Sequence, residues 1–290
     1  MTTIYHAFDQ AGLDAAYNNR NHTPDFQRYV DRWAAGSDAA RATVPSVRDL
    51  NYGPSPRQTL DVFRPAAASP PGGRPALMYV HGGYWQGNHK DGYAFPAAQV
   101  TAAGALYIPV TYDLCPAVTM TELVAQLRRA VIWLHRNAAG IGLDPHRIVV
   151  AGHSAGGHLA ATLAQTDWTA HGLPAAALAG AVPLSGLYDL EPIRLCYLNA
   201  ACRMDAAEAR ALSPIHHVAR RPIPLLLAVG GAELPELVRQ TRDHGAALAT
   251  AGVAPEAIVE TQGGNHFSIV DSLFEPAGPL WPALTRMMGL

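Results

Sequence analysis

Residues 152–156 read Gly-His-Ser-Ala-Gly, which places Ser154 between two glycines. The apolar run RIVVA (147–151) precedes this pentapeptide, and AGGHLAATLAQ (155–165), which has the composition of a helix, follows it. A strand, a tight turn and a helix in this order hold a serine in a strained backbone conformation, with its hydroxyl clear of the sheet and close to the helix N-terminus. The pattern predicts that Ser154 is a nucleophile that attacks a carbonyl carbon.

A serine hydroxyl needs a base that takes its proton and a carboxylate that orients the base. On a sheet that carries such a turn, the expected chain order is Ser, then Asp or Glu, then His. Thirteen histidines are present, and His266 lies just past the last strand-like run, in GGNHFSIV (263–270). This position favours His266 as the base, whereas His81 is expected to anchor a loop by hydrogen bonding.

The carboxylate is expected after the strand-like run IPLLLAVG (223–230). Glu233 follows this run by three residues and is the preferred candidate. Asp189, which follows an earlier strand-like run, is the alternative. Glu236 and Asp271 are interpreted as residues that stabilise their own helices.

The apolar run ALMYV (76–80) stops at His81-Gly82-Gly83-Tyr84-Trp85. Attack on a carbonyl creates an oxyanion, and backbone amides that are already fixed in place stabilise that charge. Glycines can turn their amides inward without a side chain in the way. We therefore expect the oxyanion hole to consist of the amides of Gly82, Gly83 and Ala155. Tyr84 and Trp85 are candidate substrate-binding residues, although Trp85 could equally be a packing residue.

The rest of the chain supplies the elements that must position these residues. Strand-like runs alternate with helix-like segments, which predicts βαβ units and a mainly parallel sheet. The expected strands include two short ones within 51–65, followed by 76–80, 105–112, 147–152, 178–186, 223–230 and 254–260. The clearest expected helices span 119–138, 155–165 and 233–252.

Two further segments are expected to shape a substrate pocket. Residues 9–40 predict a helical N-terminal arm, and residues 186–218 are too long for a simple connection and predict a small helical cap. No internal linker separates two cores, so residues 1–290 are interpreted as one domain. Tyr17, Tyr188 and Leu198 are candidate lining residues from these segments, with a core position as the alternative for each.

Composition narrows the class of protein. Hydrophobic residues make up 49% of the 290 and charged residues 15%, which is typical of a globular protein with a deep core. The net charge is −2 and no basic cluster occurs, which argues against nucleic acid or an anionic membrane as a partner. The N-terminus does not resemble a signal peptide, and the three cysteines favour reduced thiols in the cytoplasm.

These motifs together resemble the α/β-hydrolase superfamily. The HGGYW loop (81–85) is similar to the HGGxW signature of the kynurenine formamidase (arylformamidase) group, which is close to the hormone-sensitive-lipase-like esterases. YNNR (17–20), YDLCP (112–116), SGLYDLEPI (185–193) and LSPIHH (212–217) are similar to the same group. The resemblance implies an α/β-hydrolase fold with a mainly parallel central sheet, flanking helices and a small helical cap. It departs from the group only in carrying Glu233 where aspartate is usual.

The resemblance implies hydrolysis of a small, aromatic formamide, of the N-formylkynurenine type, through an acyl-enzyme. It implies a small-molecule substrate and no metal or organic cofactor. A short-chain carboxylesterase is the first alternative, and a ligand-binding protein that has lost turnover is a remote one, against which the complete apparent triad argues. The sequence leaves the oligomeric state open, with a homodimer as one option.

Overall fold

The computed structural model describes residues 2–218 and 223–290, and in them eight strands form one sheet. Their order across the sheet is β1-β2-β4-β3-β5-β6-β7-β8. The strands are β1 (Ser46–Asn51), β2 (Thr59–Phe63), β3 (Arg74–Val80), β4 (Leu106–Val110), β5 (Leu143–His153), β6 (Gly180–Leu184), β7 (Leu226–Gly230) and β8 (Ala257–Thr261). β2 pairs antiparallel with β1 and β4. The remaining neighbours in this order, β4-β3-β5-β6-β7-β8, all pair in parallel. The expected mainly parallel sheet is thus confirmed.

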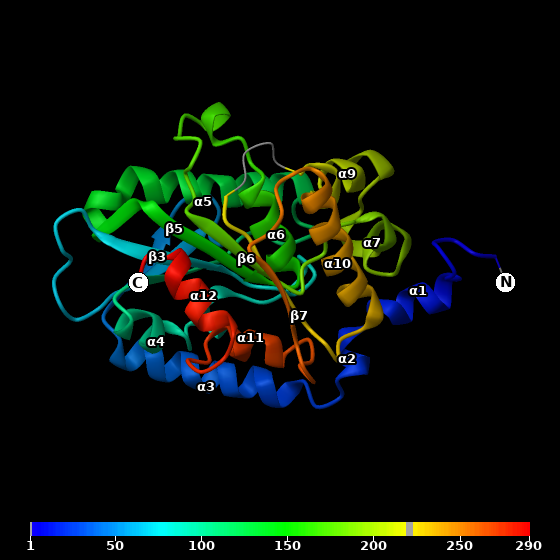
Figure 1. Ribbon diagram of the computed structural model, residues 1–290, viewed down its shortest axis with the longest axis horizontal. Coiled ribbons are helices and arrows are strands. Elements are labelled where there is room, and N and C mark those ends of the chain that lie inside the picture. The colour runs from blue at the N-terminus through cyan, green and yellow to red at the C-terminus, as the bar shows by residue number, and fades with distance from the viewer. Residues whose placement is uncertain (1, 219–222) are drawn as a thin grey trace.

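Helices cover both faces of the sheet (Figure 1). They are α1 (Gln10–Ala16), α2 (Asn19–His22), α3 (Gln27–Thr43), α4 (Ala97–Ala102), α5 (Met120–Ile141), α6 (Ala155–Ala164), α7 (Glu191–Leu195), α8 (Asn199–Cys202), α9 (Ala206–Ala211), α10 (Pro235–Thr250), α11 (Ser268–Leu273) and α12 (Leu280–Met287). In Figure 1, α3, α4, α11 and α12 lie below the sheet, and α5, α6 and α10 lie above it. Because both faces are covered, the central strands are apolar on both sides.

The core consists of two clusters, one on each face. Along β3, Met78 and Val80 point into the cluster that α5, α6 and α10 cover, whereas Leu77 and Tyr79 point into the cluster that α3, α4, α11 and α12 cover. This alternation follows from the two-residue period of a strand. Because β3 to β8 run parallel, their carboxyl ends lie at one edge of the sheet, where loops can carry a site.

Local sequence explains where the long helix α5 begins and ends. The Thr119 side chain accepts a hydrogen bond from the Glu122 amide (3.1 Å), which caps the first turn. Gly142 ends the helix with φ +71°, a conformation that glycine adopts without strain.

The N-terminal arm comprises α1, α2 and α3, rather than one continuous helix. Tyr17, between α1 and α2, is fully buried, and its hydroxyl donates to Glu236 Oε2 on α10 (2.9 Å). Its carbonyl accepts from the Tyr84 hydroxyl (2.6 Å). The arm is therefore attached both to the body of the domain and to the loop that follows β3.

The segment between β6 and β7 contains α7, α8, α9 and the 3₁₀ helix Pro214–His216, in agreement with the expected helical cap. Cap residues such as Ile193 and Leu198 join the core cluster on the α5–α6 face. No helix in the described part of the chain has the length and apolar character that a bilayer span requires.

Candidate active site

Ser154 stands at the turn between β5 and α6. Its φ and ψ are 58° and −119°, a strained conformation for a residue with a side chain. The turn is tight enough to need glycines: a Cβ on Gly152 would lie 2.2 Å from the Gly156 carbonyl oxygen, and one on Gly156 would lie 2.0 Å from the Val80 oxygen. The sequence spacing around Ser154 thus has a direct steric cause.

Glu233, which follows β7, and His266, which follows β8, are hydrogen bonded to each other. Glu233 Oε2 accepts a hydrogen bond from His266 Nδ1 (2.6 Å), and both side chains are buried. Glu233 Oε1 accepts from the Gly230 amide (2.7 Å) and from Ser185 Oγ (2.5 Å). Since Nδ1 donates to the carboxylate, Nε2 is the nitrogen that can accept a proton from a serine.

Asp189, the alternative acid, lies away from His266. Its Oδ2 accepts from the Tyr5 hydroxyl (3.0 Å), and its Oδ1 accepts from the Glu191 amide (3.0 Å). The geometry therefore brings Glu233, and not Asp189, to the histidine. Asp271 lies in the first turn of its own helix, as expected, and in addition accepts hydrogen bonds from Arg32 and Trp33 on α3.

Ser185 is a part of this site that the sequence reasoning missed. It is fully buried, has φ 48° and donates to the carboxylate that holds the histidine. A signal was present, because Ser185 ends the apolar run that lies beside the acid-bearing strand in a parallel sheet.

The loop after β3 approaches Ser154 closely. A Cβ on Gly82 would lie 3.1 Å from Ser154 Cβ, and Gly83 has φ +113° and would place a Cβ 2.7 Å from the Gly87 oxygen. No acceptor within the described residues takes a hydrogen bond from the Gly82 or Gly83 amide. Ala155 opens α6, and the first amides of a helix have no partner inside it.

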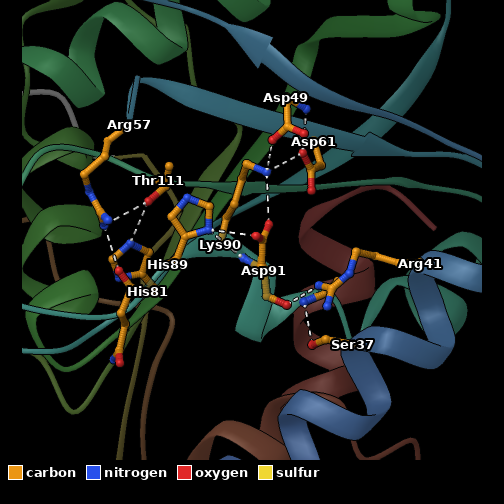
Figure 2. A network of polar contacts seen from close by, with 12 residues as sticks. Ser37, Arg41, Asp49, Arg57, Asp61, His81, His89, Lys90, Asp91 and Thr111 are labelled. Carbon is orange, nitrogen blue, oxygen red and sulfur yellow. Dashed lines mark hydrogen bonds and ion pairs between the residues drawn. The ribbon is translucent and has the colours of Figure 1, made fainter. Parts of the chain in front are cut away.

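His81 anchors this loop, and Figure 2 shows its ring close to Thr111. Its Nδ1 donates to the Gly82 carbonyl (2.9 Å), its Nε2 accepts from the Thr111 hydroxyl (3.3 Å), and its ring stacks on Tyr112 with centroids 4.4 Å apart. Burial lowers the pKa of His81 to about 3, so the ring stays neutral. These contacts suit an anchor, as expected from the sequence, and not a base.

Lys90, the only lysine of the chain, lies buried where the same loop ends. Figure 2 shows its ammonium between Asp49 (2.7 Å), Asp61 (2.7 Å) and Asp91 (3.1 Å). Burial acts to lower the pKa of Lys90, but the hydrogen bonds to Asp49 and Asp61 outweigh it and raise the pKa above its ordinary value. The lysine is therefore charged, and it ties the loop to β1 and β2.

Replacing Lys90 by methionine is expected to lower the free energy of unfolding by ~3–5 kcal/mol, because Asp61 is 1% exposed and would keep a buried negative charge without a positive charge beside it. Urea unfolding followed by circular dichroism measures the change. The double variant Lys90→Met/Asp61→Leu serves as the matched control and should regain much of the loss, since it removes both charges. An unfolding midpoint of Lys90→Met equal to that of the parent protein would contradict this interpretation.

A cavity of about 480 Å³ opens above the serine. Ser154 and His266 line it, together with residues from the N-terminal arm, the loop after β3 and the cap. Six aromatic side chains contribute to its wall, namely Phe26, Trp33, Tyr84, Tyr93, Tyr197 and Phe267. A cavity of this size and character suits a small aromatic ligand.

His153 lies beside His266 in this cavity, and their ring centroids are 4.5 Å apart. Burial, and to a smaller extent the neighbouring His266, lower the pKa of His153 well below its usual range. A neutral His153 does not oppose the positive charge that His266 would acquire as a base. Elsewhere in residues 2–218 and 223–290, no three His, Cys, Asp or Glu side chains gather as metal ligands would.

Of the five side chains expected to contact substrate, Tyr84 and Leu198 line the cavity and three do not. Trp85 is fully buried with its ring edge-on to His158, Tyr188 stacks on His244, and Tyr17 reaches Glu236 in the core. Each of these three residues thus takes the packing or core position that the sequence left open as the alternative to substrate contact. Large aromatic rings fill cores as readily as they line pockets, and here burial on the α5–α6 face prevailed.

The sequence reasoning missed much of the arm's contribution to the cavity. Asn19, Arg20, Phe26 and Trp33 line it, whereas the expectation had named only Tyr17 from the arm. Among the described residues that line the cavity, Arg20 carries the only permanent charge, and none is an aspartate or glutamate. The YNNR motif (17–20), which contains Asn19 and Arg20, was the available signal for these two residues.

Comparisons with known proteins give the same picture of the chain as a whole. The family model described as BD-FAE matches residues 60–175. Kynurenine formamidase from Danio rerio is 32% identical over 268 residues, which are 90% of this chain and 88% of that protein. Esterase LipQ from Mycobacterium tuberculosis is 30% identical over 78% of this chain and 58% of its own length.

A solved structure supports the fold. A candidate thioesterase from Silicibacter sp. TM1040 superposes with a TM-score of 0.79 and 31% identity, over 94% of this chain and 98% of that one. The relatives are α/β-hydrolases of esterase and formamidase types, so the expected fold class and hydrolase class are confirmed.

Proposed function

This chain belongs to the kynurenine formamidase family of α/β-hydrolases, and we propose that it hydrolyses a formamide carried by an aromatic amine. The observation that carries the proposal is the similarity to the Danio rerio kynurenine formamidase across 90% of the chain. The aromatic wall of the cavity, with Phe26 and Phe267 among its members, supports a substrate with an aromatic ring. N-formylkynurenine is the substrate with which the proposal is first tested.

In the proposed reaction, Ser154 Oγ attacks the formyl carbon while His266 Nε2 takes the hydroxyl proton. Glu233, hydrogen bonded to Nδ1, orients the imidazole and stabilises its charged form. The tetrahedral intermediate then loses the aromatic amine, which receives the proton from His266. A formyl ester of Ser154 remains, and a water activated by His266 hydrolyses it to formate.

The negative charge of the tetrahedral intermediate falls on the former carbonyl oxygen. The amides of Gly82, Gly83 and Ala155 are the donors proposed for it, because they lie around Ser154 and are held by the anchored loop and by the start of α6. Loss of one such donor typically lowers kcat by on the order of 100-fold or more.

A short-chain carboxylesterase is the second candidate function. The similarity to Esterase LipQ supports it, since the same nucleophile and base can open an ester. Both functions share the acyl-enzyme, and they differ in the leaving group. We also propose a cytoplasmic location, which the three free cysteines support.

Product analysis tests the formamide proposal. Purified protein incubated with N-formylkynurenine should release formate and the free aromatic amine in a 1:1 ratio, over many turnovers per protein molecule. Consumption of p-nitrophenyl esters without any formate from the formamide would favour the esterase instead.

Arg20 is expected to favour substrates that bear a carboxylate. Its guanidinium carbon lies 5.2 Å from the Phe26 ring centroid at the wall of the cavity, and no acceptor within the described residues pairs with it. Replacing Arg20 by glutamine should raise KM for N-formylkynurenine roughly tenfold, because a charge-assisted hydrogen bond is lost, and leave KM for neutral formanilide nearly unchanged. Steady-state kinetics with both substrates measure the split.

Arg28→Gln is the matched control for this prediction. Arg28 also lies over an aromatic ring, 4.8 Å from the Tyr29 centroid, but it does not line the cavity. Its replacement should leave both KM values as they are. Equal KM changes in Arg20→Gln for N-formylkynurenine, which bears a carboxylate, and for formanilide, which has none, would argue against a carboxylate contact.

A further inference from the structure

Asn19 connects the N-terminal arm to the loop that carries the proposed oxyanion hole. It begins α2, is 5% exposed and lines the cavity. Its Nδ2 donates to the Tyr84 hydroxyl (2.9 Å), and Tyr84 is the residue directly after Gly83. The side chain therefore lies between the substrate space and the loop.

The orientation of the Asn19 amide follows from counting protons. A tyrosine hydroxyl has a single proton, and Tyr84 donates it to the Tyr17 carbonyl (2.6 Å). Toward Asn19 the hydroxyl can only accept, so the NH₂ group of Asn19 must face it. Oδ1 is thereby fixed on the other branch of the amide.

Asn19 Oδ1 is buried and has no hydrogen-bond partner among the described residues. An acceptor left in this state destabilises the protein, and buried polar groups in folded proteins usually have partners. The cost is removed if a bound molecule supplies a donor. Because Asn19 lines the cavity above Ser154, a bound substrate can supply the donor once a small movement of neighbouring side chains uncovers Oδ1, which solvent does not reach in the structure as it stands.

We propose that Asn19 Oδ1 accepts a hydrogen bond from an N–H group of the substrate and so selects amides over the corresponding esters. The inference rests on the proposed function and adds a residue that decides between its two candidate leaving groups. A formamide of a primary amine carries an N–H next to its carbonyl carbon. An ester has an oxygen there, which only accepts and would leave Oδ1 unpaired.

The neighbouring polar residues support this assignment to Asn19. Asn88 also lines the cavity, and its NH₂ group donates to the Gly82 carbonyl (3.2 Å) and to the Tyr93 hydroxyl (3.1 Å). Gln86 Nε2 donates to the Leu198 carbonyl (3.0 Å). Asn19 Oδ1 is the amide oxygen of the cavity wall that is both buried and unpaired among the described residues.

The test compares p-nitroformanilide with p-nitrophenyl formate, which share the ring and the formyl group and differ in N–H against oxygen. In Asn19→Ala, kcat/KM for the formamide should fall about tenfold or more, while kcat/KM for the formate stays within about threefold of the parent value. The retained ester activity shows that the variant is folded and that its nucleophile works. Asn21→Ala, an exposed position of the same helix outside the cavity, should change neither value.

A parallel loss for both substrates would overturn the inference, because it would mean that Asn19 acts only by holding Tyr84. No loss for either substrate would overturn it as well. If the parent protein cleaves the formate but not the formamide, the proposed function itself falls, and with it any amide preference for Asn19 to explain. Turnover of the formamide with an unchanged ratio in Asn19→Ala would remove the inference alone.

Discussion

Replacing Ser154 by alanine is expected to lower kcat for N-formylkynurenine by about 10⁶-fold and to leave the fold intact. The hydroxyl is the atom that forms the acyl-enzyme, and no other side chain can take its place at this turn. Alanine tolerates the site sterically, and the strain of φ 58° is no greater for it than for serine. Progress curves at high enzyme concentration, beside circular dichroism spectra, measure both properties.

A fluorophosphonate probe gives an independent readout of the same prediction. The parent protein should gain the mass of one phosphonyl group, at Ser154, and Ser154→Ala should gain none. A serine outside the site provides the control: Ser272→Ala on α11 should label like the parent protein. Labelling of Ser154→Ala, or its hydrolysis of substrate at the parent rate, would remove Ser154 from the mechanism. A protein that binds ligand without turnover would fail to react at all.

Replacing Glu233 by glutamine is expected to lower kcat by about 10⁴-fold. The carboxylate accepts three hydrogen bonds, from His266 Nδ1, from Ser185 Oγ and from the Gly230 amide. A glutamine would place an NH₂ group against one of these donors. It would also favour the histidine tautomer with Nε2 protonated, which cannot take the proton of Ser154.

Asp189→Asn is the matched control for this prediction. Asp189 hydrogen bonds to Tyr5 and to the Glu191 amide, and its replacement should change kcat by less than about tenfold. Steady-state kinetics on both variants decide between the two acids. A large loss in Asp189→Asn together with near-normal turnover in Glu233→Gln would reverse the assignment.

The sequence predicted the parts of the site that local backbone geometry determines. The turn around Ser154 needs glycines at 152 and 156 for steric reasons, so the pentapeptide 152–156 is sufficient to predict it. The positions of Glu233 and His266 followed from a general property of parallel sheets, in which the carboxyl ends of the strands meet at one edge.

The cavity wall was much less predictable. Its composition depends on how the N-terminal arm docks across the loop after β3, and that docking rests on long-range contacts such as Tyr84 with Tyr17 and Tyr17 with Glu236. No local pattern specifies contacts that join residues so far apart in the chain. Two neighbouring aromatic residues show the same limit of sequence-based prediction, because Tyr84 lines the cavity whereas Trp85 is buried in the core.

The most direct test of the proposed activity compares kcat/KM for N-formylkynurenine and for p-nitrophenyl acetate, with Ser154→Ala as the blank for both substrates. A formamidase should prefer the formamide by orders of magnitude although the acetate has the better leaving group, because both substrates offer a ring to the aromatic wall but only N-formylkynurenine also carries a carboxylate that Arg20 can bind and orient. Turnover of the activated ester without measurable turnover of N-formylkynurenine would contradict the formamidase proposal and leave an esterase with the same catalytic residues.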